Sequence, residues 1–230
     1  MSRQIVLDTE TTGMDPNTGD RIVEIGCVEM IDRMLTGNHF HVYINPERDM
    51  PVEAYNVHGL SEEFLSDKPV FAKIAQSFLE YIDGGELIIH NASFDMKFLD
   101  YELKQLGLPS LTSQCLVIDS LQLAREMYPG QRNNLDALCK RLGIDNSKRT
   151  LHGALLDSEI LAQVYLAMTG GQDSLFGGGE AEEEDQLLAQ SIVESQVVQQ
   201  QTLSNDRTRV IVANDEELAL HEAFIAKFKQ

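Results

Sequence analysis

The apolar run Ile5-Val6-Leu7 is followed at once by two acidic residues, Asp8 and Glu10. A short continuous apolar run is typical of a strand that is buried on both faces of a sheet. Side chains alternate along a strand, so both carboxylates are expected on the same face. Two such carboxylates repel each other and lose hydration unless cations lie between them. Two carboxylates at this spacing, without further motifs, more often mark a strand end that emerges into solvent. The metal-site interpretation therefore depends on motifs elsewhere in the chain.

The chain up to residue 171 predicts a single α/β domain. Two more strands are expected over residues 22–31 and 40–44, joined by short loops as in an antiparallel meander. Apolar runs at residues 87–89 and 116–118 predict two further strands. The expected fold class is α/β, with a mixed five-stranded sheet (three antiparallel strands, then two further strands) flanked by helices. Helical spacing is found over residues 70–82, 91–106, 134–142 and 153–168.

Changes in composition divide the chain into three parts. A glycine pair ends the first part, residues 1–171. Residues 172–204 contain a glycine run, an acidic run and many glutamines and serines, which is typical of a flexible linker. Residues 205–230 carry an apolar stretch at 210–212 and then the spacing of an amphipathic helix. The predicted organisation is therefore one domain with a flexible C-terminal tail.

The net charge of −19 at neutral pH argues against a protein that grips nucleic acid by itself. Proteins that bind nucleic acids generally present a basic surface to the phosphates. Two features would reconcile an acidic chain with DNA. Divalent cations can neutralise a carboxylate site, and a basic partner protein can hold the substrate.

Cysteine usage and hydropathy indicate a cytoplasmic protein. The three cysteines, Cys27, Cys115 and Cys139, are widely spaced and form no CxxC pair. This pattern argues against a zinc ribbon or a disulfide framework and favours a reducing compartment. No stretch approaches the roughly 18 uninterrupted apolar residues of a membrane helix.

Two later segments each place an aspartate at the start of a predicted helix. Asp95, in the segment HNASFD, shares a helical stripe with Phe98 and Leu99, so it faces the packed side. Asp157, in the segment HGALLD, lies on the core-facing stripe of its helix. His152 opens that segment and is expected in the loop or first turn before the helix, free to swing over a site. Taken alone, each residue is ordinary, because the helix dipole favours a solvated first-turn aspartate and a lone histidine is usually a surface residue.

Together these segments supply four carboxylates that can converge at one end of the sheet: Asp8, Glu10, Asp95 and Asp157. Carboxylate oxygens suit Mg²⁺ or Mn²⁺, and the lack of clustered cysteine or histidine argues against zinc. Two such ions, about 4 Å apart, stabilise the attacking and leaving oxygens in phosphodiester cleavage. His152 can take the proton from the attacking water, because histidine titrates near neutral pH. The pattern predicts a site for two-metal phosphodiester hydrolysis.

The order of the motifs DxETTG, HNxxFD and HxxxxD resembles the histidine-containing branch of the DEDD exonuclease superfamily. The resemblance covers roughly residues 4–168. It implies an RNase H-like fold, two-metal catalysis and release of 5′-mononucleotides from a 3′ end. It also implies that the four carboxylates are the metal ligands and that His152 is the general base.

The same resemblance implies which residues hold the 3′-terminal nucleotide. Met14, Val57 and Phe94 would form an apolar wedge that grips a base without reading it, since every base offers a π-face. Val57 and Phe94 fit equally well as plain core residues. Arg132, in the loop 131–134, is the only cation expected near the edge of the site, where it contacts phosphate or is simply solvated. The other positions implied for substrate binding are Asp8, Glu10, Thr11, Gly13, His58, Asn91 and Asp157.

The tail resembles that of the proofreading subunits of bacterial replicative DNA polymerases. QDSLF, with Gln172, Leu175 and Phe176, resembles the short peptide by which bacterial proteins dock on the sliding clamp. Chance capping of the domain by Phe176 is the alternative. Residues 205–230 resemble the anchor for the polymerase catalytic (alpha) subunit, and an apolar segment without a domain of its own needs a partner to cover it. A small third core subunit is a further candidate partner.

Three functional hypotheses follow. The leading one is a 3′→5′ exonuclease that removes mispaired 3′-terminal nucleotides from DNA as the proofreading subunit of a replicative polymerase. A free-standing 3′→5′ RNA exonuclease would share the motifs but would have no use for residues 172–230. A non-catalytic scaffold that links polymerase and clamp would tolerate the loss of a carboxylate, and all four are present.

Overall fold

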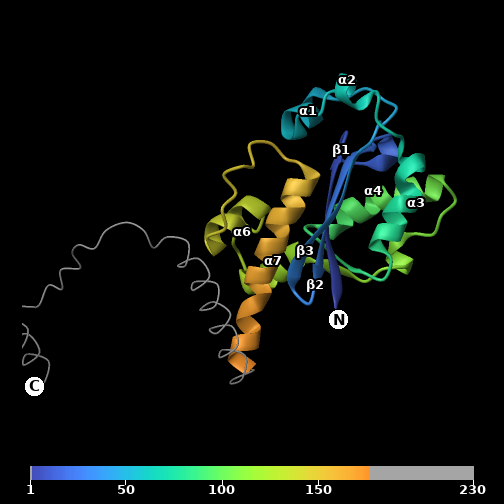
Figure 1. Ribbon diagram of the computed structural model, residues 1–230. Helices are drawn as coiled ribbons and strands as arrows, with labels where there is room; N and C mark the ends of the chain where they lie inside the picture. The colour runs from blue at the N-terminus through green and yellow to red at the C-terminus, as the bar shows by residue number, and fades with distance from the viewer. Residues whose placement is uncertain (1, 177–230) are drawn as a thin grey trace, which may run out of the picture. The chain divides into compact units, whose positions relative to one another are not determined.

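The structure is a computed structural model that describes residues 2–176, with only the backbone described for residues 171–176. Its strands form one mixed sheet in the order β3-β2-β1-β4-β5 (Figure 1). This arrangement confirms the predicted α/β class and the predicted five-stranded sheet. The strands are β1 (Arg3–Thr11), β2 (Ile22–Ile31), β3 (Met34–Tyr43), β4 (Glu86–Ile89) and β5 (Val117–Asp119).

Strand β1 lies at the centre of the sheet. It pairs antiparallel with β2 and parallel with β4, while β3 continues the antiparallel side and β5 the parallel side. The register places Asp8 opposite Gly26 and Glu10 opposite Glu24. Because β1, β4 and β5 run in the same direction, their carboxyl ends meet at one edge of the sheet, where loops can build a site.

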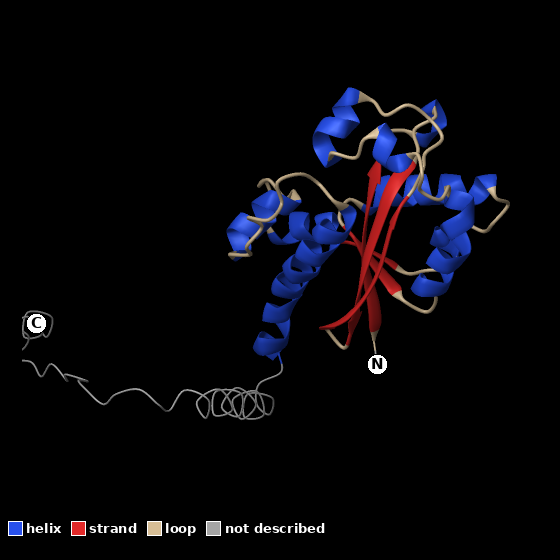
Figure 2. Ribbon diagram, turned by 45° about the horizontal axis from the view of Figure 1, so that its top comes forward, coloured by secondary structure: helices blue, strands red, loops and turns tan. Residues whose placement is uncertain are grey.

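Helices cover both faces of the sheet, and Figure 2 shows the strands between two groups of helices. Helices α1 and α2 lie beyond the end of the sheet toward which β1 runs (Figure 1). Within the described residues the helices are α1 (Val52–His58), α2 (Glu62–Leu65), α3 (Phe71–Ile82), α4 (Ala92–Gln105), α5 (Ser120–Met127), α6 (Leu135–Leu142) and α7 (Ala154–Phe176), with short 3-10 helices η1 (Pro16–Thr18) and η2 (Leu111–Ser113). None of these helices is long and apolar enough to cross a membrane.

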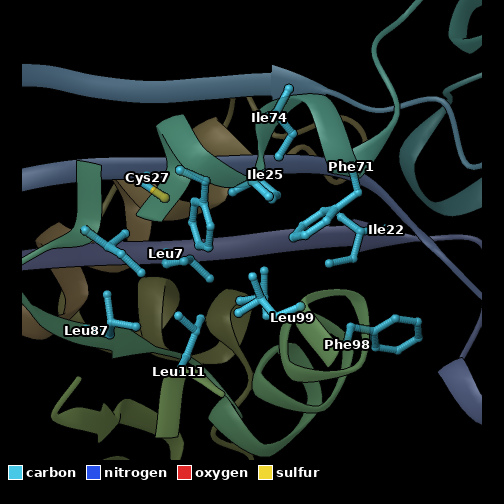
Figure 3. Packing of buried hydrophobic residues seen from close by; sticks show 14 of the residues in the cluster. Leu7, Ile22, Ile25, Cys27, Phe71, Ile74, Leu87, Phe98, Leu99 and Leu111 are labelled. Carbon is cyan, nitrogen blue, oxygen red and sulfur yellow. The ribbon is translucent and has the colours of Figure 1, made fainter. Parts of the chain in front are cut away.

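The side chains of β1 alternate between two separate hydrophobic clusters, one on each face of the sheet. Leu7 points to the face covered by α3 and α4, where it packs with Phe71 and Leu99 (Figure 3). Val6 points to the opposite face and belongs to the cluster formed with Leu161 of α7 and other residues of α5, α6 and α7. Burying each such side chain contributes about 1.5–3 kcal/mol, so both layers fix the position of β1.

Several element boundaries differ from the predicted ones. The third strand begins at Met34, not at residue 40, because its first half, MLTGN, is an exposed edge without an alternation of apolar and polar side chains. Helices α1, α2 and α5 were not predicted.

Helix α7 runs to Phe176 instead of ending at residue 168, so the glycine pair at residues 170–171 lies inside it. A glycine costs about 1 kcal/mol relative to alanine in a helix but does not forbid one. The predicted tail, residues 205–230, and most of the predicted linker lie outside the described residues.

Candidate active site

A cavity of about 790 Å³ opens where the carboxyl ends of β1, β4 and β5 meet the helices that follow them. Ligand sites in proteins typically measure roughly 300–1,000 Å³. The cavity is lined by all five residues that were predicted to carry the chemistry: Asp8, Glu10, Asp95, His152 and Asp157. The structure therefore brings the separate sequence motifs together.

Strand β1 supplies two of the carboxylates and fixes a third. Thr9 points to the face opposite Asp8 and Glu10, toward the first turn of α4. Its backbone N and its Oγ1 both donate to Oδ1 of Asp95, at 3.1 and 2.7 Å. Asp95 is only 2% exposed, as its position on the packed stripe of α4 predicted.

The fourth carboxylate is positioned by close packing of α7 on the backbone of β2. A Cβ atom at Gly26 would lie 2.2 Å from the backbone of both Ala154 and Leu155. Only glycine therefore allows the first turn of α7 to come this close. Oγ of Ser158 donates to the carbonyl oxygen of Gly26 at 2.9 Å and holds the contact. Asp157 precedes this serine and is buried at 3% exposure, on the core-facing side as predicted.

The donor atoms are arranged as a metal site requires. Carboxylate oxygens of Glu10 and Asp157 and a ring nitrogen of His152 all lie within 4.8 Å of one another. Asp8 and Asp95 line the same cavity and add further hard oxygen donors. These residues fit a divalent cation.

Burial and mutual repulsion make the carboxylates difficult to ionise. Burial raises the pKa of Asp8 well above its usual range, and the neighbouring carboxylates of Asp95, Glu10 and Asp157 raise it further. Burial, together with Asp157 and Glu24, raises the pKa of Glu10 to about 8. Burial raises the pKa of Asp95 to about 7, although the hydrogen bonds from Thr9 act in the opposite direction. A bound cation would relieve this repulsion, which is a physical reason for metal binding.

One arginine lies among the carboxylates. Arg149 forms a bidentate ion pair with Asp157 through Nε and Nη2, at 2.5 and 2.8 Å. Arg125 and Arg132 also line the cavity, so the prediction that Arg132 is the only cation near the site is wrong. The sequence missed Arg149 because it lies in the irregular loop before α7, where no period predicts the direction of a side chain. Its place three residues before His152 was the only signal.

His152 lies in the loop before α7, as predicted, and its side chain is 49% exposed. Its backbone N donates to the carbonyl oxygen of Val57 at 3.0 Å, which ties the loop to α1. Nδ1 is 3.1 Å from Nη2 of Arg149. Burial and the positive charge of Arg149 lower the pKa of His152, so the neutral form that can accept a proton is favoured.

The residues predicted to hold a nucleotide divide into two groups. Met14, Asn91 and Phe94 line the cavity, whereas Thr11, Gly13, Val57 and His58 do not. Val57 is 44% exposed, so the alternative that it is a core residue is wrong. Phe94 is half-buried and its ring packs against that of Phe98, with the centroids 5.1 Å apart.

Asn91 precedes α4 in a left-handed backbone conformation with a φ of 68°, and its side chain makes no capping hydrogen bond. The backbone N of Asn91 instead donates to Oδ1 of Asp119, which holds the residue at the cavity edge. At the other end of the domain, Gln172, Leu175 and Phe176 fall in the last turns of α7, and their side chains lie outside the described part of the structure.

A mixed sheet with a carboxylate cluster that fits divalent cations, at the carboxyl ends of its parallel strands, is the arrangement expected of a two-metal nuclease, and comparisons with known proteins agree. The sequence profile of the exonuclease (RNase T) family matches residues 5–165. The chain is 56% identical over 229 residues to the protein of Salmonella typhimurium named DNA polymerase III subunit epsilon, covering 97% of this chain and 92% of that protein. It is 54% identical over 229 residues to the Escherichia coli protein of the same name, with the same coverage. The solved structure of exonuclease X in complex with 5′-overhanging duplex DNA is 27% identical, has a TM-score of 0.56, and is matched over 79% of this chain and 96% of that one.

The chain belongs to the exonuclease family and, within it, to the family of DNA polymerase III epsilon subunits. The predicted resemblance and the RNase H-like fold that it implied are confirmed.

Proposed function

We propose that the protein is a metal-dependent 3′→5′ exonuclease that removes mispaired 3′-terminal nucleotides from DNA as 5′-mononucleotides, as the proofreading subunit of a bacterial replicative polymerase. The observation that carries this proposal is the convergence of four carboxylates and His152 in one cavity. The relatives named DNA polymerase III subunit epsilon support the replicative role, because the match extends over 97% of the chain.

Each residue of the cluster has a proposed role in hydrolysis. Asp8, Glu10, Asp95 and Asp157 hold two divalent ions, Mg²⁺ or Mn²⁺. When bound, the ions stabilise the charge that develops on the attacking and leaving oxygens. His152 accepts the proton of the attacking water, a role supported by its exposure and its lowered pKa. Thr9 keeps Asp95 in the orientation that ligation needs.

The proposed nucleotide site extends from the carboxylates along the cavity. Met14 and Phe94 contact the terminal base, and the exposed Val57 completes the apolar wedge from α1. Thr11, Gly13, His58 and Asn91 surround the same nucleotide. Arg125 and Arg132 line the cavity, and their proposed role is to bind the phosphates of the strand.

The proposed partners explain how so acidic a chain acts on DNA. Residues 205–230 bind the polymerase catalytic (alpha) subunit, and residues 172–176 bind the sliding clamp through Gln172, Leu175 and Phe176. The linker, residues 172–204, contains the clamp-binding peptide and lets the nuclease domain, residues 1–171, reach the primer end at a high effective concentration. A small third core subunit is a further proposed partner, and the complex works in the cytoplasm.

Degradation of a single-stranded DNA oligonucleotide labelled at its 5′ end tests the direction of hydrolysis. The protein should produce a ladder that shortens from the 3′ end in Mg²⁺ or Mn²⁺ and no ladder in EDTA. A matched oligonucleotide with 3′-terminal phosphorothioate linkages should resist. A single short labelled product at the earliest times, which indicates attack from the 5′ end, would contradict the proposal. Faster degradation of a matched RNA oligonucleotide would support a free-standing RNA exonuclease instead.

A further inference from the structure

The guanidinium of Arg149 holds two of the site's key residues at once. Its side chain is 8% exposed, inside the carboxylate cluster. Nε and Nη2 donate to the two oxygens of Asp157, so both oxygens of this carboxylate accept a hydrogen bond from Arg149. Nη2 also lies 3.1 Å from Nδ1 of His152. The ring nitrogen that faces Arg149 is therefore not free to accept a proton from water while this contact lasts.

This arrangement and metal ligation compete for the same atoms. One oxygen of Asp157 lies within 4.8 Å of a carboxylate oxygen of Glu10 and a ring nitrogen of His152, and both oxygens of Asp157 accept hydrogen bonds from Arg149. A carboxylate oxygen that ligates a divalent ion points a lone pair at the ion, and the positive charge of Arg149 opposes the binding of a cation to the same carboxylate. Arg149 and a metal ion therefore compete for the oxygens of Asp157.

The carboxylate of Asp136 is a second anionic partner for Arg149. Nη1 donates to Oδ1 of Asp136 at 3.0 Å, and the side chain of Asp136 on α6 is 57% exposed. Asn146 donates to the same oxygen at 2.9 Å, so this carboxylate already anchors the loop that carries Arg149. A rotation of the arginine side chain can release Asp157 while the ion pair with Asp136 remains.

We propose that Arg149 is a positioning residue that competes with the metal for Asp157. It holds Asp157 and His152 together until a divalent ion enters, and then it retains only Asp136. This inference rests on the proposed metal-dependent function. The alternative is that Arg149 keeps its contacts with Asp157 and His152 when the metal binds. In that case its removal would disorder the ligands and weaken metal binding.

The direction of the change in metal affinity distinguishes the two views. Calorimetric titration of the full-length protein with Mn²⁺, without nucleic acid, measures this affinity directly. The Arg149→Gln variant should bind Mn²⁺ at least about fivefold more tightly than wild type, because no ion pair has to break and one positive charge is gone. Arg48→Gln is the matched control, since Arg48 pairs with Asp20 and does not line the cavity, and its affinity should be unchanged.

A double-mutant cycle tests the role of Asp136. Asp136→Asn should weaken Mn²⁺ binding by about threefold or more, because Arg149 then has only Asp157 as a strong partner. The same substitution in the Arg149→Gln background should have much less effect. An equal effect in both backgrounds would mean that Asp136 acts on the metal independently of Arg149, which would overturn the proposed exchange.

Thermal unfolding gives a second readout that does not depend on activity. In EDTA, the melting temperature of Arg149→Gln should be lower than that of wild type, because the carboxylates lose their compensating charge. Saturating Mn²⁺ should reduce this difference in melting temperature. If the Gln variant does not fold, Arg149→Lys keeps the charge without the bidentate contact and should also bind Mn²⁺ more tightly. Unchanged or weaker Mn²⁺ binding in these variants would overturn the inference and leave the nuclease function standing. No Mn²⁺ binding by wild type would contradict the proposed function itself, and the inference with it.

Discussion

The protonation of Glu10 shows how a single residue couples the site to the stability of the fold. Its carboxyl group is buried beside Asp157 and Glu24, and its pKa is raised to about 8. The unfolded chain would ionise this group near its ordinary value of about 4.3. The folded state therefore binds more protons between these two pH values, so its stability must fall as the pH rises through that range.

In EDTA, the free energy of unfolding is therefore expected to decrease from pH 5 to pH 8. Glu10→Gln should reduce this slope and stabilise the metal-free protein at pH 8 by about 1–3 kcal/mol, because the amide cannot ionise. Urea unfolding at pH 5, 6.5 and 8 measures the effect, with the exposed Glu53→Gln as control. If the free energy of unfolding of Glu10→Gln depends on pH as steeply as that of wild type, Glu10 is not a source of the pH dependence.

At the scale of elements, the site depends on how closely α7 approaches the sheet. The contact of Gly26 with Ala154 and Leu155 leaves no space for a methyl group. Any displacement of α7 moves Asp157 away from Glu10 and Asp8, which are fixed to β1.

Gly26→Ala should therefore impair both folding and catalysis. Overpacking at a backbone contact costs about 1–3 kcal/mol, and misplacing a reacting group by about 1 Å can lower kcat by about 100-fold. Gly170→Ala is the matched control on the same helix, because among the side chains that the structure describes a Cβ there would meet only Arg33, at 3.6 Å. Comparing the unfolding free energy and the nuclease rate of the two variants checks the expectation. Wild-type activity in Gly26→Ala would contradict the proposed positioning of α7.

The elements that build the site were predictable where a face is buried. The run before Asp8 predicted β1, and the stripes of Asp95 and Asp157 predicted the sides of α4 and α7 on which they lie. The loop before α7 has no such period, so the direction of Arg149 could not be predicted. Contacts such as Thr9 with Asp95 were also missed, because 86 residues separate the partners along the chain.

At the scale of the whole molecule, the catalytic residues and the proposed attachment site lie in separate parts of the chain. The carboxylates and His152 all lie within residues 8–157, whereas the proposed polymerase anchor lies at residues 205–230. The net charge of −19 favours such attachment, because an acidic chain gains little from the phosphate backbone of DNA.

Deleting residues 205–230 should leave the nuclease rate on short single-stranded DNA within about twofold of wild type but abolish co-purification with the polymerase catalytic subunit. Pull-down with the purified catalytic subunit and a parallel nuclease assay measure the two properties. Replacing Leu175 and Phe176 by alanine is the matched control, because it should affect clamp binding and leave the polymerase contact intact. Co-purification of the truncated chain would place the anchor elsewhere.

The most direct test of the central claim is the release of mononucleotides from a 3′-labelled DNA oligonucleotide in Mg²⁺, with wild type, Asp8→Ala and His152→Ala compared side by side. Wild type should release 5′-mononucleotides. Both variants should be slower by at least about 100-fold, since one loses a metal ligand and the other the general base. An RNA oligonucleotide in parallel should be the poorer substrate. Equal rates in wild type and either variant, or no release by wild type, would contradict the assignment of this cavity as the site of hydrolysis.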